Sequence, residues 1–293
     1  RFLPRGWVGF CLMVGLCDTI RFFMTPFIHK AFIALGVVVV IASCFAAFTW
    51  HYDHFYEFIL LGLLLVLVPF APRDSFTLKR IAYLYIVYIS AALVVDLLIG
   101  LTVTKAWYYS YTSVVEYVVL YVWIYPAGGF VLTLSYLIGR KYFDIRSSGL
   151  VIDKRIFKSI FAFFLVATVL LVLVKNQIPF AIWSLIFLIN SILALCALSS
   201  LRSELNGRSS YIRDLIASPK YALLLTTLVT FTNLIVHEYP NVHVHAWTYV
   251  VNTSSILDFS LLGIPLAMWI IWPLLVIGSV SLYYETESRK AYK

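Results

Sequence analysis

Three acidic residues carry the chemistry that this sequence makes possible. Asp96 lies well inside a long apolar run, while Glu116 and Asp258 open two other apolar runs. An ionisable side chain in membrane hydrocarbon costs about 2.5 to 3.5 kcal/mol on insertion scales, so its default interpretation is functional. An acid in the first turn of a helix is also favoured by the helix dipole, and this plainer explanation stays open for Glu116 and Asp258. We predict that the three residues are acid–base groups.

Two aromatic tetrads lie 140 residues apart, at 106–109 (Ala-Trp-Tyr-Tyr) and 246–249 (Ala-Trp-Thr-Tyr). Arg80 and Lys220, which open the preceding apolar runs, are separated by the same 140 residues. A fixed offset of this kind indicates a duplicated unit, in which each copy reads as basic loop, apolar run, aromatic loop and apolar run. The residues that we expect to contact a ligand are Trp107, Tyr108, Tyr109, Trp247, Tyr249 and Pro265.

Histidine is distributed unevenly, because five of the six histidines fall at the expected outer ends of apolar runs. These are His51, His54, His237, His243 and His245. Two imidazoles from different helices can hold a b-type haem, and histidines with carboxylates can hold a transition metal. The alternative is that they belong, with Tyr and Trp, to the headgroup belt of a membrane. No spacing among them is a diagnostic ligand motif.

Composition places the chain in a broad class. Hydrophobic residues make up 62% of the sequence and charged residues 12%, and the mean hydropathy is +0.93. These values lie far outside the soluble range and predict a polytopic membrane protein. The four cysteines include no Cys-x-x-Cys pair, so neither a disulfide framework nor a zinc site is expected.

The predicted fold class is all-α, a helical membrane bundle with about eight transmembrane helices. The expected spans are 31–50, 56–71, 81–104, 114–139, 159–174, 178–199, 221–237 and 256–283. The apolar stretch at 6–17 is too short to span, since a transmembrane helix needs about 20 residues. We favour an N-terminal interfacial helix there over a signal peptide. The expected domains are an interfacial segment at 1–30, a first membrane repeat at 31–145 and a second at 146–293.

The basic residues give the orientation of this bundle. With eight spans and a cytoplasmic amino terminus, 20 of the 22 Lys and Arg residues fall inside, and only Lys105 and Lys175 fall outside. This asymmetry follows the positive-inside rule. It predicts a multi-pass protein of the cell membrane with both termini in the cytoplasm. The net charge of +8 is then explained by orientation and lipid headgroups, and no nucleic-acid partner is expected.

Prolines interrupt two of the expected spans, with Pro126 in the fourth and Pro265 and Pro273 in the eighth. Each removes a backbone hydrogen bond and should kink or break its helix. The freed carbonyl needs protein or water beside it. The kinks therefore serve either packing or a cavity lined by both copies.

The second tetrad carries a family resemblance. Trp247-Thr-Tyr249, followed by Gly263-Ile-Pro-Leu-Ala-Met-Trp269, resembles the small membrane-embedded lycopene cyclase domain of bacteria and archaea. In that family a Trp-x-Tyr loop leads to a Pro-x-Glu-Glu-Trp helix start. The similarity covers 80–139 and 220–283, under half of the chain. This sequence has Ala267 and Met268 where the family has its glutamates, and the first copy keeps only Glu116.

The resemblance implies proton-initiated cyclisation of a linear carotenoid. An acid protonates a terminal double bond, and a base removes a proton from the resulting carbocation. Glu116 and Asp96 would do this work, with Asp258 contributing from the second copy, and no cofactor would be needed. Aromatic side chains suit such chemistry because their faces stabilise cations.

Two other functions remain open at this stage. One is a membrane anchor or redox subunit that holds haem b, a transition metal or a quinol through the outer histidines and serves an extracytoplasmic protein partner. The other is a lipid-embedded subunit that binds a polyisoprenoid or quinone, or only membrane lipid, without chemistry. We favour the cyclase-like function, because the tetrad resemblance is specific whereas the histidine cluster is only compositional.

Overall fold

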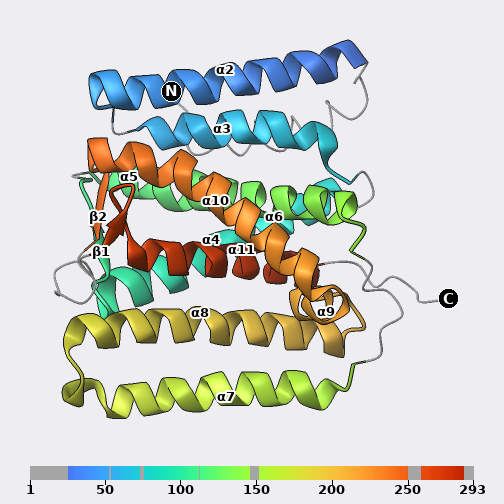
Figure 1. Ribbon diagram of the computed structural model, residues 1–293, viewed down its shortest axis with the longest axis vertical. Helices are drawn as coiled ribbons and strands as arrows, with labels where there is room; N and C mark the ends of the chain where they lie inside the picture. The colour runs from blue at the N-terminus through green and yellow to red at the C-terminus, as the bar shows by residue number, and fades with distance from the viewer. Residues whose placement is uncertain are drawn as a thin grey trace.

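The protein is an all-α helical bundle, as the sequence predicts (Figure 1). The computed structural model describes residues 26–52, 54–72, 76–111, 113–145, 152–249 and 259–286. Within these residues, seven helices are long and apolar enough to cross a membrane, and the apolar helix Phe55–Phe70 is shorter. The eight apolar segments correspond in order to the eight expected spans, so the chain is an integral membrane protein of the multi-pass type.

The helices follow the chain in a simple order. They are α2 (Pro26–Trp50), α3 (Phe55–Leu67) with η1 (Val68–Phe70), α4 (Leu78–Ala92) continued by η3 (Leu93–Val103), α5 (Val114–Val119), η4 (Leu120–Ile124), α6 (Tyr125–Tyr142), α7 (Lys154–Leu173), η5 (Lys175–Gln177), α8 (Phe180–Leu205), α9 (Tyr211–Ala217), α10 (Pro219–Val244) and α11 (Leu266–Thr286). Four short strands complete the fold: β1 (Trp107–Tyr109), β2 (Trp247–Tyr249), β3 (Ser260–Leu261) and β4 (Ile264–Pro265).

Two predicted span boundaries are wrong. The seventh span does not end at His237, because α10 runs through Pro240 to Val244 and stops where His245 adopts the left-handed conformation, with φ 57°. The eighth helix begins ten residues later than expected, because 260–265 forms the hairpin β3–β4, and Gly263 has φ +74° in its turn. Pro265 therefore lies in a strand and kinks no helix. The interfacial helix expected at 1–30 falls mostly outside the described residues, and 26–30 belong to α2.

The other prolines lie in helices, as expected. Pro126 occupies the first turn of α6, directly after the π-helical segment η4. Pro273 lies inside α11, and Pro240, which the sequence analysis did not consider, lies inside α10. The helix is continuous from Val114 to Tyr142, so Pro126 lies within it and not at a free start. Pro126, Pro240 and Pro273 therefore each remove one hydrogen bond within their helices.

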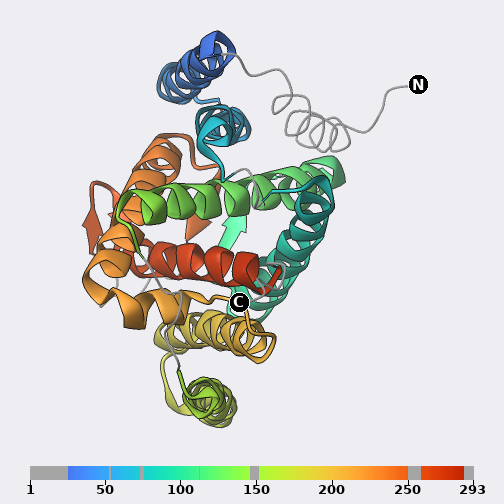
Figure 2. The same cartoon turned by 90° about the vertical axis from the view of Figure 1, so that its right-hand side faces the viewer.

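The helices form a central group with one peripheral layer on each side (Figures 1 and 2). On one side α2 packs on α3, and on the other α7 packs on α8. Phe157 is the one buried residue of α7, and Phe163 and Leu173 are about 70% exposed. Such a surface suits lipid rather than water. The largest core cluster joins α4, α6, α10 and α11 in the centre.

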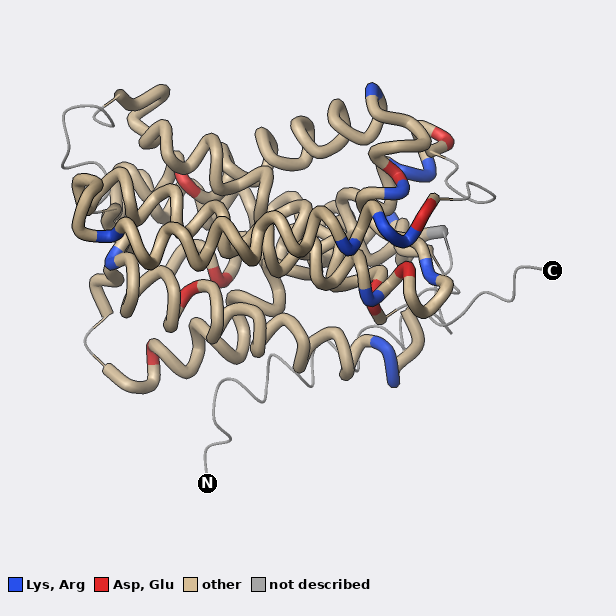
Figure 3. Tube along the Cα trace, turned by 90° about the horizontal axis from the view of Figure 1, so that it is seen from below, with Lys and Arg blue, Asp and Glu red and all other residues tan. Residues whose placement is uncertain are grey.

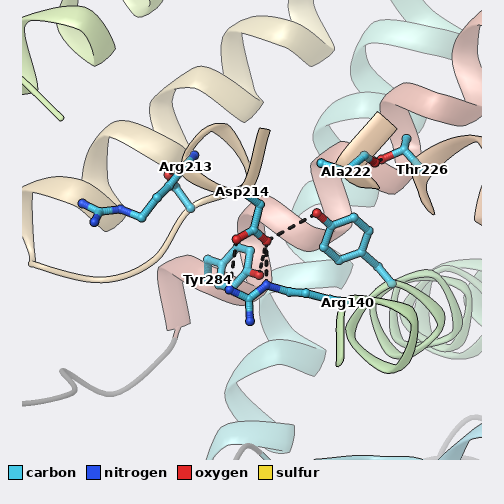
Figure 4. A network of polar contacts seen from close by, with 8 residues as sticks. Arg140, Arg213, Asp214, Ala222, Thr226 and Tyr284 are labelled. Carbon is cyan, nitrogen blue, oxygen red and sulfur yellow. Dashed lines mark hydrogen bonds and ion pairs between the residues drawn. The ribbon is translucent and has the colours of Figure 1, made fainter. Parts of the chain in front are cut away.

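Most of the Lys and Arg residues gather toward one end of the bundle (Figure 3). A buried network at this end ties α9 to the central helices (Figure 4). Asp214 is fully buried and accepts hydrogen bonds from Arg140 Nε at 2.8 Å and Arg140 Nη2 at 3.0 Å. The hydroxyls of Tyr136 and Tyr284 also donate to Asp214, at 3.3 and 2.6 Å. Because every oxygen of this carboxylate is engaged, we interpret the network as structural.

Candidate functional site

The two aromatic tetrads meet at the opposite end of the bundle. Their strands β1 and β2 pair antiparallel, with Trp107 opposite Tyr249, Tyr108 opposite Thr248 and Tyr109 opposite Trp247. This register is symmetric about its central pair, since each Trp lies opposite the Tyr of the other copy. The pairing joins residues about 140 positions apart. It brings the predicted ligand-contacting residues of both copies into one place.

The first tetrad surrounds Asp96. The indole N–H of Trp107 donates to Asp96 Oδ1 at 2.6 Å, and the hydroxyl of Tyr109 donates to the same oxygen at 2.9 Å. The hydroxyl of Tyr121, from η4, donates to Oδ2 at 2.6 Å. Tyr125 lies beside them, 2.5 Å from Tyr109 between hydroxyl oxygens. Asp96 is only 2% exposed, so these donors replace the water that a buried carboxylate loses.

The second tetrad surrounds Glu238 in the same way. The hydroxyl of Tyr249 donates to Glu238 Oε1 at 2.7 Å, and the indole N–H of Trp247 approaches Oε2 at 3.2 Å. The third donor is the indole N–H of Trp272 in α11, 2.9 Å from Oε1. Glu238 is 3% exposed. It lies inside α10 because that helix continues past the predicted boundary.

The two carboxylates thus occupy equivalent places. We call Asp96 with Trp107, Tyr109 and Tyr121 the Asp96 half-site. Glu238 with Trp247, Tyr249 and Trp272 is the Glu238 half-site. In each, the acid comes from the helix before the strand, two donors come from the strand, and a third comes from the helix after it.

The spacing differs slightly between the copies, since Asp96 precedes Trp107 by 11 residues and Glu238 precedes Trp247 by nine. Asp96 lies in the π-helical segment η3, whose wider turns take up more residues per unit length. Gly100 in η3 lies against the Trp107 ring, and a Cβ there would lie 2.3 Å from a ring carbon. Trp107 can therefore reach Asp96 only because residue 100 has no side chain.

The strand tyrosines are held in their neutral form. Burial, and then the charge of Asp96, raises the pKa of the Tyr109 hydroxyl well above its usual value. Burial, and then the charge of Glu238, raises the pKa of the Tyr249 hydroxyl in the same way. Both phenols therefore remain hydrogen-bond donors at physiological pH, and both donate to a carboxylate oxygen.

A cavity of about 530 Å³ connects the two half-sites. Its volume falls within the range of about 300 to 1,000 Å³ that is typical of small-molecule sites. Both carboxylates line it, with Trp107, Tyr109, Trp247, Tyr249 and Trp272, and the remaining wall is largely aliphatic and aromatic. Tyr83, Val94 and Leu195 line the cavity and are also between 37% and 52% exposed. The cavity thus reaches the lipid-facing surface between α4, η3 and α8.

Of the other two predicted acids, the structure describes only Glu116, which lies outside the cavity wall. Glu116 opens α5, where it forms a capping box with Ser113, its carboxylate 2.8 Å from the Ser113 backbone nitrogen. This geometry matches the plainer explanation, an acid in the first turn of a helix. Glu116 is not among the described residues that line the cavity. Asp258 falls outside the described residues.

The remaining predicted ligand-contacting residues differ in their surroundings. Tyr108 is 53% exposed on β1, on the opposite side of the strand from Trp107 and Tyr109. Pro265 is buried in β4. Neither belongs to the described cavity wall.

The histidines are not gathered at one point. His51 Nδ1 lies 3.3 Å from the backbone oxygen of His243, and His54 Nδ1 lies 3.1 Å from Glu57. His243 and His245 are exposed. His237 alone is deeply buried, and its Nδ1 lies 2.8 Å from the backbone oxygen of Asn233. Across the described ranges, no group of three or more His, Cys, Asp or Glu side chains could hold a metal ion.

Sequence reasoning missed Glu238, Tyr121 and Trp272 as members of the site. A signal for Glu238 was present, because it precedes its tetrad at nearly the same spacing as Asp96. The signal was missed because the seventh span was predicted to end at His237, which left Glu238 outside the span. Tyr121 and Trp272 gave no such signal, since one aromatic residue in an apolar helix resembles any other.

The chain was compared with protein-family models, curated proteins and solved structures, and none of them matches it.

Proposed function

We propose that this integral membrane protein binds a polyisoprenoid in the cavity between its half-sites and performs acid–base chemistry on a terminal double bond through Asp96 and Glu238. The observation that carries the proposal is the pairing of two buried carboxylates at one end of a largely apolar cavity. Ionisable groups at such positions are costly and usually functional. The opening toward lipid suits a substrate that is dissolved in the membrane.

The chemistry is an isomerisation. One carboxylic acid gives its proton to the inner carbon of the terminal double bond, which leaves a tertiary carbocation on the outer carbon that bears two methyl groups. An internal double bond attacks that cation and closes a ring, and the other carboxylate removes a proton to form the new double bond. No atoms are gained or lost. This is the cyclase-like function that the tetrads suggest, with Glu238 in place of Glu116 and Asp258.

The aromatic donors support both steps. Three donors on each carboxylate stabilise the anion that remains after proton transfer. The cavity wall offers indole and phenol faces to the carbocation, and cation–π contacts are worth about 2 kcal/mol when water is excluded. A dry aromatic wall also keeps water from the reactive cation.

The test uses purified protein and lycopene, a linear polyene. We expect conversion to a product of unchanged mass and different retention time, lowered at least about 100-fold by Asp96→Asn and by Glu238→Gln, since general acid–base catalysis contributes about 10² to 10⁴. Glu116→Gln preserves the capping interaction and should keep activity. Loss of activity in Glu116→Gln alone would favour the acid predicted from sequence. A Soret band that disappears with His237→Ala would favour a redox anchor instead.

A further inference from the structure

The two half-sites differ in the residues beside their carboxylates. The wall of the cavity carries His237, directly before Glu238, and Asn233, one helical turn before His237. The equivalent positions in the first copy, placed by aligning Asp96 with Glu238, are Ala91 and Val95, which also line the cavity. The Asp96 half-site therefore has aliphatic side chains at both of these positions. The Glu238 half-site has two additional polar side chains.

His237 offers a hydrogen-bond acceptor. Its Nδ1 lies 2.8 Å from the backbone oxygen of Asn233, and a carbonyl oxygen can only accept, so Nδ1 carries the proton. In a neutral imidazole the other nitrogen is then an acceptor. His237 Nε2 is buried and has no hydrogen-bond partner among the described residues. A buried polar atom without a partner is uncommon and calls for an explanation.

Asn233 offers a second acceptor on the same face of α10. Its amide nitrogen donates one of its two hydrogens to the backbone oxygen of Val229 at 2.8 Å, and its amide oxygen is an acceptor. Residues four positions apart lie one above the other on a helix. Asn233 and His237 are 3% and 7% exposed. Both belong to the cavity wall, so their acceptors can serve a ligand but not bulk water.

We infer that the Glu238 half-site recognises a hydroxyl group at one end of an isoprenoid, through the acceptors of His237 and Asn233. This inference rests on the proposed function and names the substrate class more closely, as an isoprenoid alcohol. The hydroxyl donates its proton to an acceptor that otherwise has no partner. The Asp96 half-site, with the aliphatic Ala91 and Val95 in place of the polar pair, contacts the hydrocarbon part of the same molecule.

The experiment compares all-trans retinol with its methyl ether, followed by quenching of the tryptophan emission of the purified full chain. The ether keeps the polyene and the oxygen but cannot donate a hydrogen bond. We expect the wild type to bind retinol about tenfold more tightly than the ether, the upper range for one net hydrogen bond. His237→Phe and Asn233→Leu should each weaken retinol binding and leave binding of the ether unchanged.

His243→Phe is the matched control, because it makes the same change on α10 at an exposed residue outside the described cavity wall. It should keep the preference for the alcohol. Equal binding of both ligands by the wild type would overturn the inference and leave the proposed isoprenoid site standing. The same conclusion follows if His237→Phe and Asn233→Leu both keep the tenfold preference. Failure of both ligands to bind would overturn the inference and the proposed function together.

Discussion

At the scale of single residues, the two carboxylates of the site accept hydrogen bonds from indole and phenol groups. An indole N–H can only donate, so the bonds from Trp107 and Trp272 hold a carboxylate oxygen as an acceptor. Tyr109 and Tyr249 keep the proton that they donate to a carboxylate, because their pKa values are raised. Each carboxylate is therefore fixed in direction as well as in place. A fixed acid is what proton transfer to a single carbon atom requires.

The strand tyrosines provide a prediction about pH. Because their pKa values are raised, the folded state favours the neutral phenols of Tyr109 and Tyr249. The stability that this provides is fully present below about pH 10, the pKa of an exposed tyrosine, and is lost as the pH rises through the higher folded values. In an ultraviolet titration, wild type should show two more late-ionising tyrosines than Tyr109→Phe/Tyr249→Phe. If the tyrosines missing from the double variant were instead two that ionise near pH 10, the prediction would be wrong.

At the scale of elements, the strand pair β1–β2 joins the two half-sites. Strands of three residues bury little by themselves and here depend on neighbouring helices. Asn241 of α10 holds β2, since its amide contacts the backbone oxygen and nitrogen of Trp247 at 3.0 and 3.1 Å. The backbone nitrogen of Ser110 continues the ladder by donating to the oxygen of Ala246 at 3.0 Å. The positions of both acids' donors therefore depend on this pairing.

The register can be tested with a disulfide. Tyr108 and Thr248 lie directly opposite each other, and directly opposed Cβ atoms lie about 4.5 to 5.5 Å apart. In a variant that lacks the native cysteines, Tyr108→Cys/Thr248→Cys should form a bridge that mass spectrometry detects after mild oxidation. Tyr108→Cys/Tyr249→Cys is the control, because neighbouring residues of a strand point to opposite faces. Equal bridging in both pairs would show that the register is wrong.

The Asp214 network gives a prediction about stability. Arg140→Met leaves a buried carboxylate without its cation, which typically costs about 3 to 5 kcal/mol of unfolding free energy. The pair of Arg202 with Glu285 is a matched control, because its N–O distance is similar at 2.9 Å while Arg202 is 59% exposed. Arg202→Met should cost about 0 to 1 kcal/mol. Thermal unfolding in detergent measures both, and equal losses would argue against the structural role of Asp214.

At the scale of the whole molecule, the ends of the bundle differ in charge and in chemistry. Figure 3 shows most Lys and Arg residues at the end where α9 lies, while the tetrads lie at the other end. The acids of the half-sites lie within the apolar part, near the tetrad end. The positive-inside rule predicts that the basic end lies in the cytoplasm. With that orientation, we expect the site to open from the outer half of the membrane.

Accessibility of single thiols tests this orientation. In intact cells, Ser110→Cys and Asn176→Cys should react with an impermeant thiol reagent, because both lie at the end opposite the basic residues. Lys154→Cys, at the start of α7, should react only after the membrane is permeabilised. The opposite pattern would invert the predicted topology while leaving the fold unchanged. The division into repeats at 31–145 and 146–293 remains a prediction in either case.

The sequence alone determined the class of the protein and the order of its helices. Hydropathy over about 20 residues is a local property, so the apolar runs could be counted and the membrane inferred without a structure. The asymmetry of basic charge and the two tetrads are equally visible along the chain. Asp96 was found for the same reason, since a lone acid in an apolar run is conspicuous.

Only the tertiary structure decided which groups share a site. Glu238 becomes a partner of Asp96 through an extended helix and a strand pairing between residues about 140 apart. Neither feature has a local signal, because a proline within α10 suggests an end to the helix and short strands have weak propensity. The role of Glu116 is not set by its sequence position either, since the same residue type serves a capping box or a catalytic acid. Burial and hydrogen-bond partners distinguish these roles, and both arise from contacts between helices that are distant in sequence.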